Sequence, residues 1–181
     1  MTTRYFLRLA FLIGFFCLVL GNAKAAPEPV RWYKVSVLVF SQPVTTDEDL
    51  TQQPGFSRPA NLKRPKLLPA QESDLAETYR RLKQSRPYHP VLHQAWIQPA
   101  LANRINAPYL VTNFHDVEGI IRLQRGQYLY VIVDMEYRAP GGTHRLREKR
   151  RVLLNETHYF DHPAFGVLVR VSPVERPDSN R

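Results

Sequence analysis

The stretch YLYVIVDMEYRAPGGTHRLREKRRVLLN, Tyr128–Asn155, decides the fold because it predicts a β-hairpin with two different faces. Apolar and polar residues alternate over Tyr128–Arg138, which is the period of a strand with one buried face. The run APGG is a turn signal, and it predicts a second strand over Thr143–Asn155. The predicted buried face of the first strand consists of Leu129, Val131, Val133, Met135 and Tyr137.

The outer face of this hairpin is charged. In the first strand it carries Tyr128, Tyr130, Asp134 and Glu136, and in the second it carries Arg145, Arg147, Lys149 and Arg151. A tight turn places Glu136 opposite Arg145 and Asp134 opposite Arg147, and such pairs stabilise a sheet by ~0.2–1 kcal/mol each. Farther from the turn, Lys149 and Arg151 lie opposite Ile132 and Tyr130, where no acidic residue remains.

This end of the outer face suits an anionic, partly apolar ligand. An arginine can hold a carboxylate by two parallel hydrogen bonds, and a tyrosine ring can stack on an apolar group. The alternative is a solvated outer face without a ligand. On the opposite face, which is the predicted core face, Glu148 and Arg150 lie together with Leu146, Val152 and Leu154. Charges there are costly unless paired, so we expect a bulge or a polar network near Arg150.

The rest of the chain predicts one α+β domain, a mostly antiparallel β-sheet packed with one main helix. Residues 41–69 contain five prolines, and they predict a long Pro-rich surface excursion because they have too few apolar residues for a core. The predicted helix is Gln71–Ser85, and the further strands are Trp32–Phe40, Val91–Ile97, Glu118–Arg125 and Gly166–Pro173.

The N-terminus has the pattern of a secretory signal peptide. Arg4 and Arg8 precede the apolar run Leu9–Leu20, and Ala23-Lys24-Ala25 predicts cleavage after Ala25. The run is shorter than the ~20 residues of a membrane-spanning helix, so no membrane anchor is expected after cleavage. Residues 26–181 are then a single periplasmic domain, with a disordered tail at 174–181.

Cleavage also sets the charge and the redox chemistry of the mature chain. It removes Cys17, the only cysteine, so no disulfide is expected. The removed segment contains three basic residues, so the net charge falls from +9 for the full-length chain to +6 for the mature chain. In an exported protein this basicity favours anionic partners of the cell envelope over nucleic acid.

Two histidine pairs raise the possibility of a metal site. His89 and His93, and likewise His158 and His162, have the spacing of zinc ligands on a helix. Pro90 and Pro163 oppose helical geometry. No glutamate directly follows His89 or His158, so neither pair has the His-Glu-x-x-His motif of a zinc protease. A zinc-dependent hydrolase is therefore the least favoured alternative, and no metal or cofactor is expected.

No catalytic residue is predicted either. The mature chain has no cysteine and no Gly-x-Ser-x-Gly nucleophile motif. Asp161 and Glu156 have nothing that singles them out as a glycosidase pair. We instead interpret HYFDHPAFG, residues 158–166, as a rigid β-connection in which Asp161 accepts backbone N–H bonds, Pro163 stiffens the chain and Gly166 permits an unusual φ.

Three blocks resemble the CsiV family: WYKVSVLVF at residue 32, YHPVLHQAWIQP at residue 88 and RRVLLNETHYFDHPAFGVLVRVSP at residue 150. The resemblance implies a non-enzymatic periplasmic peptidoglycan-binding protein of Gram-negative bacteria. It further implies support of cell shape through a bifunctional penicillin-binding protein and its outer-membrane lipoprotein activator. The motif residues it carries onto this chain are Trp96, Arg150, Arg151, Glu156, His158, Tyr159, Asp161, His162, Pro163, Phe165 and Gly166.

Two hypotheses of different class follow. In the first, the protein binds peptidoglycan: Lys149 and Arg151 hold carboxylates, Tyr130 or Tyr159 stacks on sugar, and His158 or His162 donates a hydrogen bond. Arg150, Glu156, Asp161, Pro163 and Gly166 support that surface. In the second, the protein is an adaptor whose basic face and excursion grip an acidic protein partner, without direct wall binding.

Overall fold

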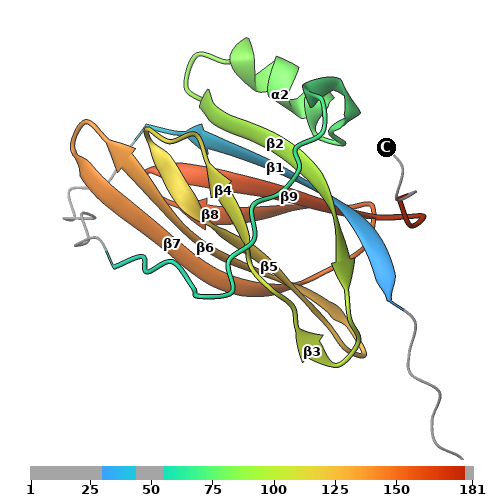
Figure 1. The fold of residues 1–181 in the computed structure, drawn as a ribbon. Helices are drawn as coiled ribbons and strands as arrows, with labels where there is room; N and C mark the ends of the chain where they lie inside the picture. The colour runs from blue at the N-terminus through green and yellow to red at the C-terminus, as the bar shows by residue number, and fades with distance from the viewer. Residues whose placement is uncertain (1–29, 44–54, 178–181) are drawn as a thin grey trace, which may run out of the picture.

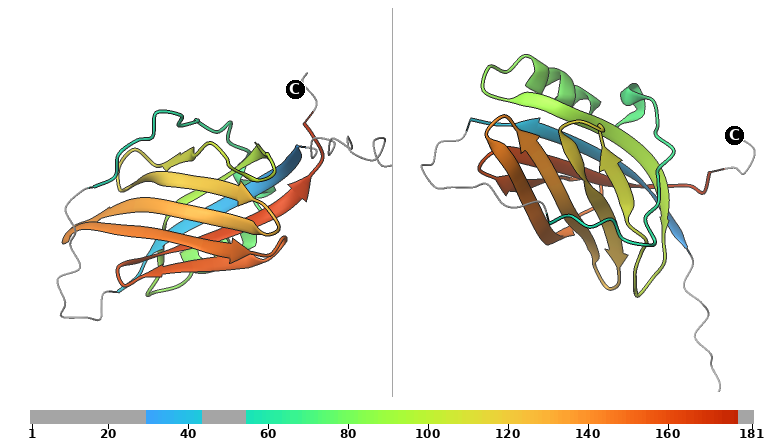
Figure 2. Two further views of the ribbon diagram at one scale, coloured as in Figure 1. Left: turned by 90° about the horizontal axis from the view of Figure 1, so that it is seen from below. Right: turned by 60° about the vertical axis from the view of Figure 1, so that its left-hand side comes forward.

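The protein is described here by a computed structural model that covers residues 30–43 and 55–177. Two antiparallel β-sheets pack face to face, and one short helix lies on the outer face of one sheet (Figures 1 and 2). The helical segments are a 3-10 turn at Ala70–Glu72 and α2 at Ala76–Lys83. The strands are β1 Arg31–Ser41, β2 His89–Ala100, β3 Arg104–Ile105, β4 Tyr109–Thr112, β5 Val117–Arg125, β6 Leu129–Ala139, β7 Gly142–Val152, β8 Thr157–His162 and β9 Phe165–Val174.

Sheet A has the strand order β2-β1-β9-β8, and sheet B has the order β3-β5-β6-β7 with β4 also paired to β5. The apolar core lies between them and takes every second residue of the long strands. Trp96, Phe160 and Phe165 are the largest of its fully buried side chains. The predicted buried face of β6 is confirmed, because Val131, Val133 and Met135 are fully buried.

The central strand β1 is buried on both faces. Tyr33, Val35, Val37 and Val39 face the core as their alternation predicts, and Ser36, Leu38 and Phe40 are buried on the other face. The segment before α2 covers part of that outer face: the Ser36 hydroxyl accepts a hydrogen bond from Asp74 N at 3.0 Å. Lys34 also pairs with the Asp74 carboxylate at 2.5 Å. The helix is therefore fixed to sheet A by polar contacts around the fully buried Leu75.

The prediction of a mostly antiparallel β-fold with one helix is confirmed, but several boundaries are wrong. The helix begins at Ala76, because Ser73 is extended with a ψ of 134° and interrupts the predicted first turn. The strand predicted over Val91–Ile97 runs from His89 to Ala100, with a bulge opposite Val39/Phe40 beside Pro90. The strands at 104–105, 109–112 and 157–162 were not predicted, because the first two are short and the third is rich in polar residues.

The described part of the predicted excursion forms a strap across sheet B, which we define as residues 55–68. In Figure 1 it crosses the strands of sheet B toward β2. Glu136, only 3% exposed, accepts hydrogen bonds from the backbone N–H groups of Gly55 and Phe56 at 3.0 and 2.8 Å. Arg58 pairs with Glu118 at 2.6 Å, and Leu68 N donates to the carbonyl of Ala95. Residues 44–54 of the excursion lie outside the described residues.

Two other expectations concern the chain ends. The predicted signal peptide, residues 1–25, lies outside the described residues, as do residues 178–181 of the predicted tail. Val174, which was placed in that tail, is the last residue of β9. Within 30–43 and 55–177, no helix has the length and apolar character needed to cross a membrane.

Candidate functional site

The hairpin of β6 and β7 has the register that its sequence predicts. Tyr130 pairs with Arg151, Ile132 with Lys149, Asp134 with Arg147 and Glu136 with Arg145. The connection needs only Pro140 and Gly141 between the paired Ala139 and Gly142, and Gly142 has a φ of 142°, where L side chains are disfavoured.

The charges of this hairpin pair only in part as predicted, because the Asp134–Arg147 pair is present at 3.9 Å but the Glu136–Arg145 pair is not. Arg145 forms two hydrogen bonds with Asp134, at 2.9 and 3.0 Å, because Glu136 is occupied by the strap. This carboxylate raises the pKa of the Arg145 guanidinium above its ordinary value. The predicted Glu136–Arg145 pair is therefore replaced by a diagonal pair.

The unpaired end of the hairpin carries two cations over tyrosine rings. Arg151 Cζ lies 3.6 Å from the centroid of the Tyr128 ring, and Lys149 Nζ lies 4.8 Å from that of Tyr130. Both contacts are short enough for a cation–π interaction, which is worth ~0.5–1 kcal/mol at an exposed site. Each ring orients its cation without neutralising the charge.

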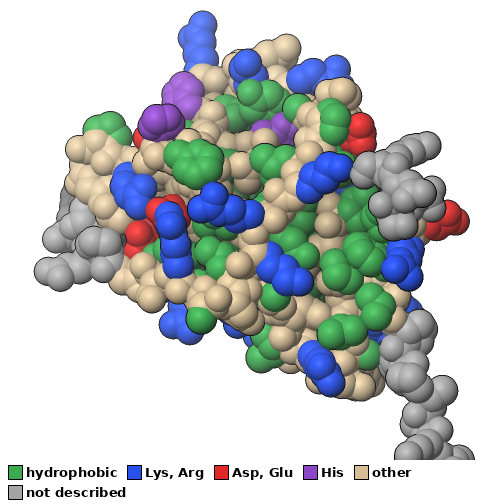
Figure 3. Space-filling view, in the orientation of Figure 1, with side chains coloured by type: hydrophobic (Ala, Val, Ile, Leu, Met, Phe, Trp, Pro, Cys, Tyr) green, Lys and Arg blue, Asp and Glu red, His purple; other side chains and the backbone are tan. Residues whose placement is uncertain are grey.

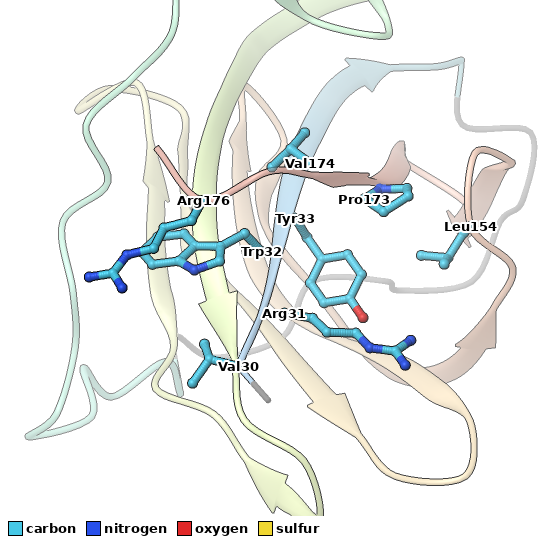
Figure 4. A pocket seen from close by; sticks show the side chains of 8 residues that line it. All are labelled: Val30, Arg31, Trp32, Tyr33, Leu154, Pro173, Val174 and Arg176. Carbon is cyan, nitrogen blue, oxygen red and sulfur yellow. The ribbon is translucent and has the colours of Figure 1, made fainter. Parts of the chain in front are cut away.

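A hollow of about 310 Å³ opens at this end of the sandwich, and its lining includes Arg31, Tyr33, Arg125, Tyr128, Arg151 and Leu154. An adjoining hollow of about 580 Å³ shares Arg31, Tyr33 and Leu154 and adds Trp32, Pro173 and Arg176. Figure 4 shows Trp32 beside Arg176 on one side of β1, and Tyr33, Arg31 and Leu154 on the other. We call these joined hollows the basic end.

The basic end brings together several arginines that have no carboxylate partner. Arg58, Arg80, Arg81, Arg138, Arg145 and Arg150 each pair with a carboxylate. Arg31, Arg151 and Arg176 form no ion pair with any described residue, and this is also true of Arg64, Arg86, Arg104, Arg122 and Arg170 elsewhere. What distinguishes the first three is that they line two adjoining hollows whose linings contain no Asp or Glu. Lys and Arg also predominate over Asp and Glu on the face shown in Figure 3. This end of the molecule is therefore a concave site of positive charge.

The segment HYFDH is not a connection between strands but the edge strand β8 of sheet A. His158 and Phe160 pair with the core residues Val169 and Val167, so they face the inside of the sandwich, as does His162. Tyr159 and Asp161 face outward. His158 Nε2 accepts a hydrogen bond from Leu153 N at 3.0 Å, and His162 Nδ1 accepts one from Ala164 N at 3.1 Å.

The six predicted ligand-binding residues consequently lie in three places. Lys149, Arg151 and Tyr130 share the outer face of sheet B, whereas Tyr159 lies on the outer face of sheet A. His158 and His162 lie between the sheets and hold the turns on either side of β8. Burial, and secondly the nearby His144, lowers the pKa of His162, which favours its neutral form.

The predicted polar network near Arg150 is present, without a bulge in the β6–β7 register. The Arg150 guanidinium bonds to Glu148 at 2.8 Å and to the carbonyl of Tyr159 at 2.5 Å, and it lies 5.1 Å from the Phe160 ring centroid. It thereby joins the edge of sheet B to the edge of sheet A. Leu154, predicted on the core face, follows the end of β7 and is 38% exposed.

The remaining support residues have different roles. Glu156 lies in the exposed turn before β8, where its side chain bonds to no described residue. Pro163 lies in the turn between β8 and β9. Two predictions for this segment are wrong: Gly166 does not have a positive φ, and among the described residues Asp161 accepts hydrogen bonds from side chains rather than from backbone N–H groups. Gly166 instead has no room for a side chain, because an added Cβ would lie within 2.6 Å of Tyr159 Cε2 and closer still to Phe40.

The two histidine pairs do not converge. His93 lies on the outer face of sheet A, where its ring stacks on Tyr79 at 4.7 Å and its Nε2 lies 2.8 Å from the Ser73 hydroxyl. Burial lowers the pKa of His93. In the part of the chain that the structure describes, no three His, Cys, Asp or Glu side chains are grouped to hold a metal ion.

A model of the CsiV family, described as peptidoglycan-binding protein, matches residues 56–174. The chain belongs to the CsiV family. The matched residues run from the strap to the last residue of β9. The CsiV match therefore includes both strands that the Arg150 side chain joins, β7 and β8. Comparisons with curated proteins and with solved structures gave no match.

The strand β1 precedes the residues matched to CsiV, yet it lies between β2 and β9 in sheet A. It supplies Arg31, Trp32 and Tyr33 to the basic end, and sequence reasoning missed these residues. Arg176 reaches the same place because β1 and β9 are antiparallel, with Trp32 opposite Val174. The sequence signal for them was only a cation and an aromatic ring at the start of a strand.

Proposed function

We propose that this CsiV-family protein binds peptidoglycan through the basic end. Arg31 and Arg151 hold carboxylates of the stem peptides, with Lys149 and Arg176 as flanking cations. Tyr128, Tyr130 and Trp32 give apolar faces for the peptide and the adjoining sugar. The observation that carries the proposal is the set of arginines without carboxylate partners around acid-free hollows, within a family of peptidoglycan-binding proteins.

The chemistry of the site fits a carboxylate-rich polymer. A guanidinium presents donors in a planar fork that matches a carboxylate, and stacking on Tyr128 fixes the plane of the Arg151 fork before a ligand arrives. The hollows are open and partly solvated, so a single contact is weak. A wall offers many copies of the ligand, and avidity then raises the overall binding.

In the cell, we infer an exported, non-enzymatic protein of the periplasm. Its signal peptide is cleaved after Ala25, and residues 26–181 act as one domain. By holding peptidoglycan, it supports cell-wall synthesis and cell shape, helping a bifunctional penicillin-binding protein and its outer-membrane lipoprotein activator. The family membership supports this role.

The test is sedimentation of residues 26–181 with purified sacculi at low and high salt. Wild type sediments at low salt, and high salt weakens its sedimentation because the contacts at the basic end are between charges. Arg151→Ala sediments less than wild type at low salt, whereas the matched control Arg147→Ala sediments like wild type. Arg147 is on the same face of β7 with its side chain 76% exposed, but it lies outside both hollows.

If wild type remains in the supernatant at low salt, direct wall binding is wrong. The adaptor function is then the one to test, by binding of the same variants to the penicillin-binding protein and its activator.

A further inference from the structure

A second surface, at the opposite end of sheet A, gathers aromatic rings from three segments. Phe40 at the end of β1, Tyr88 just before β2 and Tyr159 on β8 lie on the same outer face. Phe40 and Tyr159 stack with ring centroids 6.0 Å apart and planes at 15°, and Tyr88 meets Phe40 edge to face at 5.5 Å. We call these three residues, with Asp161 and Gln42, the aromatic face.

Gly166 is the residue that makes this stack possible. In the register of sheet A, Phe40, Gly166 and Asp161 are directly opposite one another on β1, β9 and β8. An added Cβ at Gly166 would overlap both the Phe40 and the Tyr159 ring. The missing side chain therefore lets the two rings meet over β9. This gives a structural reason for the order Tyr-x-Asp and Gly in HYFDHPAFG.

Polar groups fix the rim of the aromatic face. The Tyr159 hydroxyl donates to Asp161 Oδ1 at 2.5 Å, and the Gln42 amide donates to the same oxygen at 3.3 Å and to the carbonyl of His162 at 2.8 Å. Burial, followed by the bond to Asp161, raises the pKa of Tyr159 to about 12, so the hydroxyl keeps its proton. Asp161 Oδ2 has no partner among the described residues.

Despite this internal bonding, the rings remain accessible. Tyr88 is 39% exposed and Tyr159 is 37% exposed, whereas the core aromatics Phe160 and Phe165 are fully buried. The Tyr159 hydroxyl already has a partner, so the need to hydrate it does not explain why the ring stays exposed. An exposed, rigid tyrosine is a binding surface that loses little conformational entropy on contact.

We infer that the aromatic face binds the glycan strand of peptidoglycan, an inference that rests on the proposed function. The C–H-rich face of a pyranose ring carries partial positive charge and stacks on the electron-rich face of an aromatic ring. Its hydroxyl and amide N–H groups need acceptors beside that ring, which Asp161 Oδ2 and Gln42 Oε1 supply. The basic end then holds the stem peptide and the aromatic face holds sugar.

The two sites are far enough apart to contact different repeats of the wall. Arg31 and Ser41 are the two ends of the eleven-residue strand β1, which spans ~33 Å at the usual rise per residue. Two weak contacts on one polymer reinforce each other without contact between the sites.

The experiment uses residues 26–181 and two probes: intact sacculi, and glycan strands freed of stem peptides by an amidase. Wild type binds the stripped strands, and high salt leaves this binding unchanged because no ion pair is involved. Tyr88→Ala and Tyr159→Ala each weaken it by about five-fold or more, and Asp161→Asn weakens it less. Phe114→Ala, an exposed aromatic control on the β4–β5 turn, and Arg151→Ala leave it unchanged.

Circular dichroism and a urea midpoint for each variant separate lost binding from lost folding, and Tyr88→Ala removes a partly exposed ring that packs edge to face on Phe40. If wild type binds sacculi but not stripped strands, the glycan site is wrong and the proposed function stands. If Tyr88→Ala and Tyr159→Ala bind stripped strands like wild type, the site is also wrong. If wild type binds neither probe, the proposed function itself fails and the glycan site with it.

Discussion

Arg150 and Arg151 are neighbours in sequence, but we expect their substitutions to have opposite effects on stability and on sacculus binding. Arg150 points toward β8 and joins the two sheets, whereas Arg151 lies on the outer face of β7 at the basic end. Substitution of Arg150 therefore lowers the stability and leaves sacculus binding of the folded protein intact. Substitution of Arg151 weakens sacculus binding and leaves the stability nearly unchanged.

The magnitude follows from the contacts that each side chain makes. Arg150→Ala loses a charge-assisted bond to the Tyr159 carbonyl, worth ~1.5–3 kcal/mol, and a partly exposed ion pair with Glu148, worth ~0.2–1 kcal/mol. Loss of the contact with the Phe160 ring adds ~0.5 kcal/mol. These contacts are not additive, so we expect a loss of about 2 kcal/mol. Arg151→Ala loses only its contact with Tyr128, and we expect less than ~1 kcal/mol.

The assay is equilibrium unfolding in urea, followed by tryptophan fluorescence, with sacculus sedimentation of the same preparations. With a slope of ~2 kcal/mol per molar urea, Arg150→Ala lowers the midpoint by about 1 M. Arg150→Lys recovers only part of this loss, because an ammonium cannot reach both partners in one plane. Equal midpoints for the two alanine variants would refute the assignment of Arg150 to the sheet junction.

Three further predictions concern the strap, the sheet and the histidines. Glu136→Gln removes the charged acceptor of the backbone N–H groups of the strap. Protease cleavage within residues 55–68 therefore becomes faster, and the urea midpoint falls by ~0.5–1 M. An unchanged cleavage rate would contradict the role of Glu136 in anchoring the strap. Gly119→Ala places a Cβ 2.5 Å from backbone atoms of β6 and costs ~3 kcal/mol or more, so a soluble variant of wild-type stability would contradict the close strand approach. His93 and His162 have lowered pKa values in the folded state. Their contribution to the free energy of unfolding is therefore present above the unfolded pKa of 6.5 and is lost as the pH falls through the lower folded pKa values. Urea unfolding at pH 7 and pH 5 measures this loss, and the same pH dependence in His93→Gln and His162→Gln would exclude the two histidines as its source.

The hairpin could be predicted residue by residue because its information is local. Period-two alternation assigns the faces of β6 and β7, and a short turn leaves one register that keeps both sets of apolar residues inside. The same local information predicted that Arg150 needs a polar partner. It could not say which partner, because the Tyr159 carbonyl comes from a strand that was interpreted as a connection.

Long-range contacts account for what the sequence did not reveal. Glu136 was expected to pair with Arg145, but it binds backbone groups about eighty positions earlier in the chain. Arg31 and Arg176 line the same hollow only because β1 and β9 are adjacent and antiparallel. Alternation shows which side of a strand is buried but not whether one sheet or two surround the core, so the two-sheet packing could not be predicted.

The histidines show a subtler failure. His158 and His162 were placed in a rigid β-connection, from which one of them was expected to bind the ligand. In the edge strand β8 they alternate with Tyr159 and Asp161 and share a face with the fully buried Phe160. Once β8 is recognised as a strand, the period of two assigns all five residues to their faces.

The central claim, that the basic end binds the stem peptide, is tested most directly by NMR. Isotope-labelled protein, residues 26–181, is titrated with a soluble stem peptide that carries free carboxylates and no sugar. We predict that the amide shifts change at residues 31–33, 125–129, 151–154 and 173–176, and that salt or Arg151→Ala suppresses the changes. Absence of any shift at high peptide concentration, or shifts confined to other parts of the chain, would contradict the account.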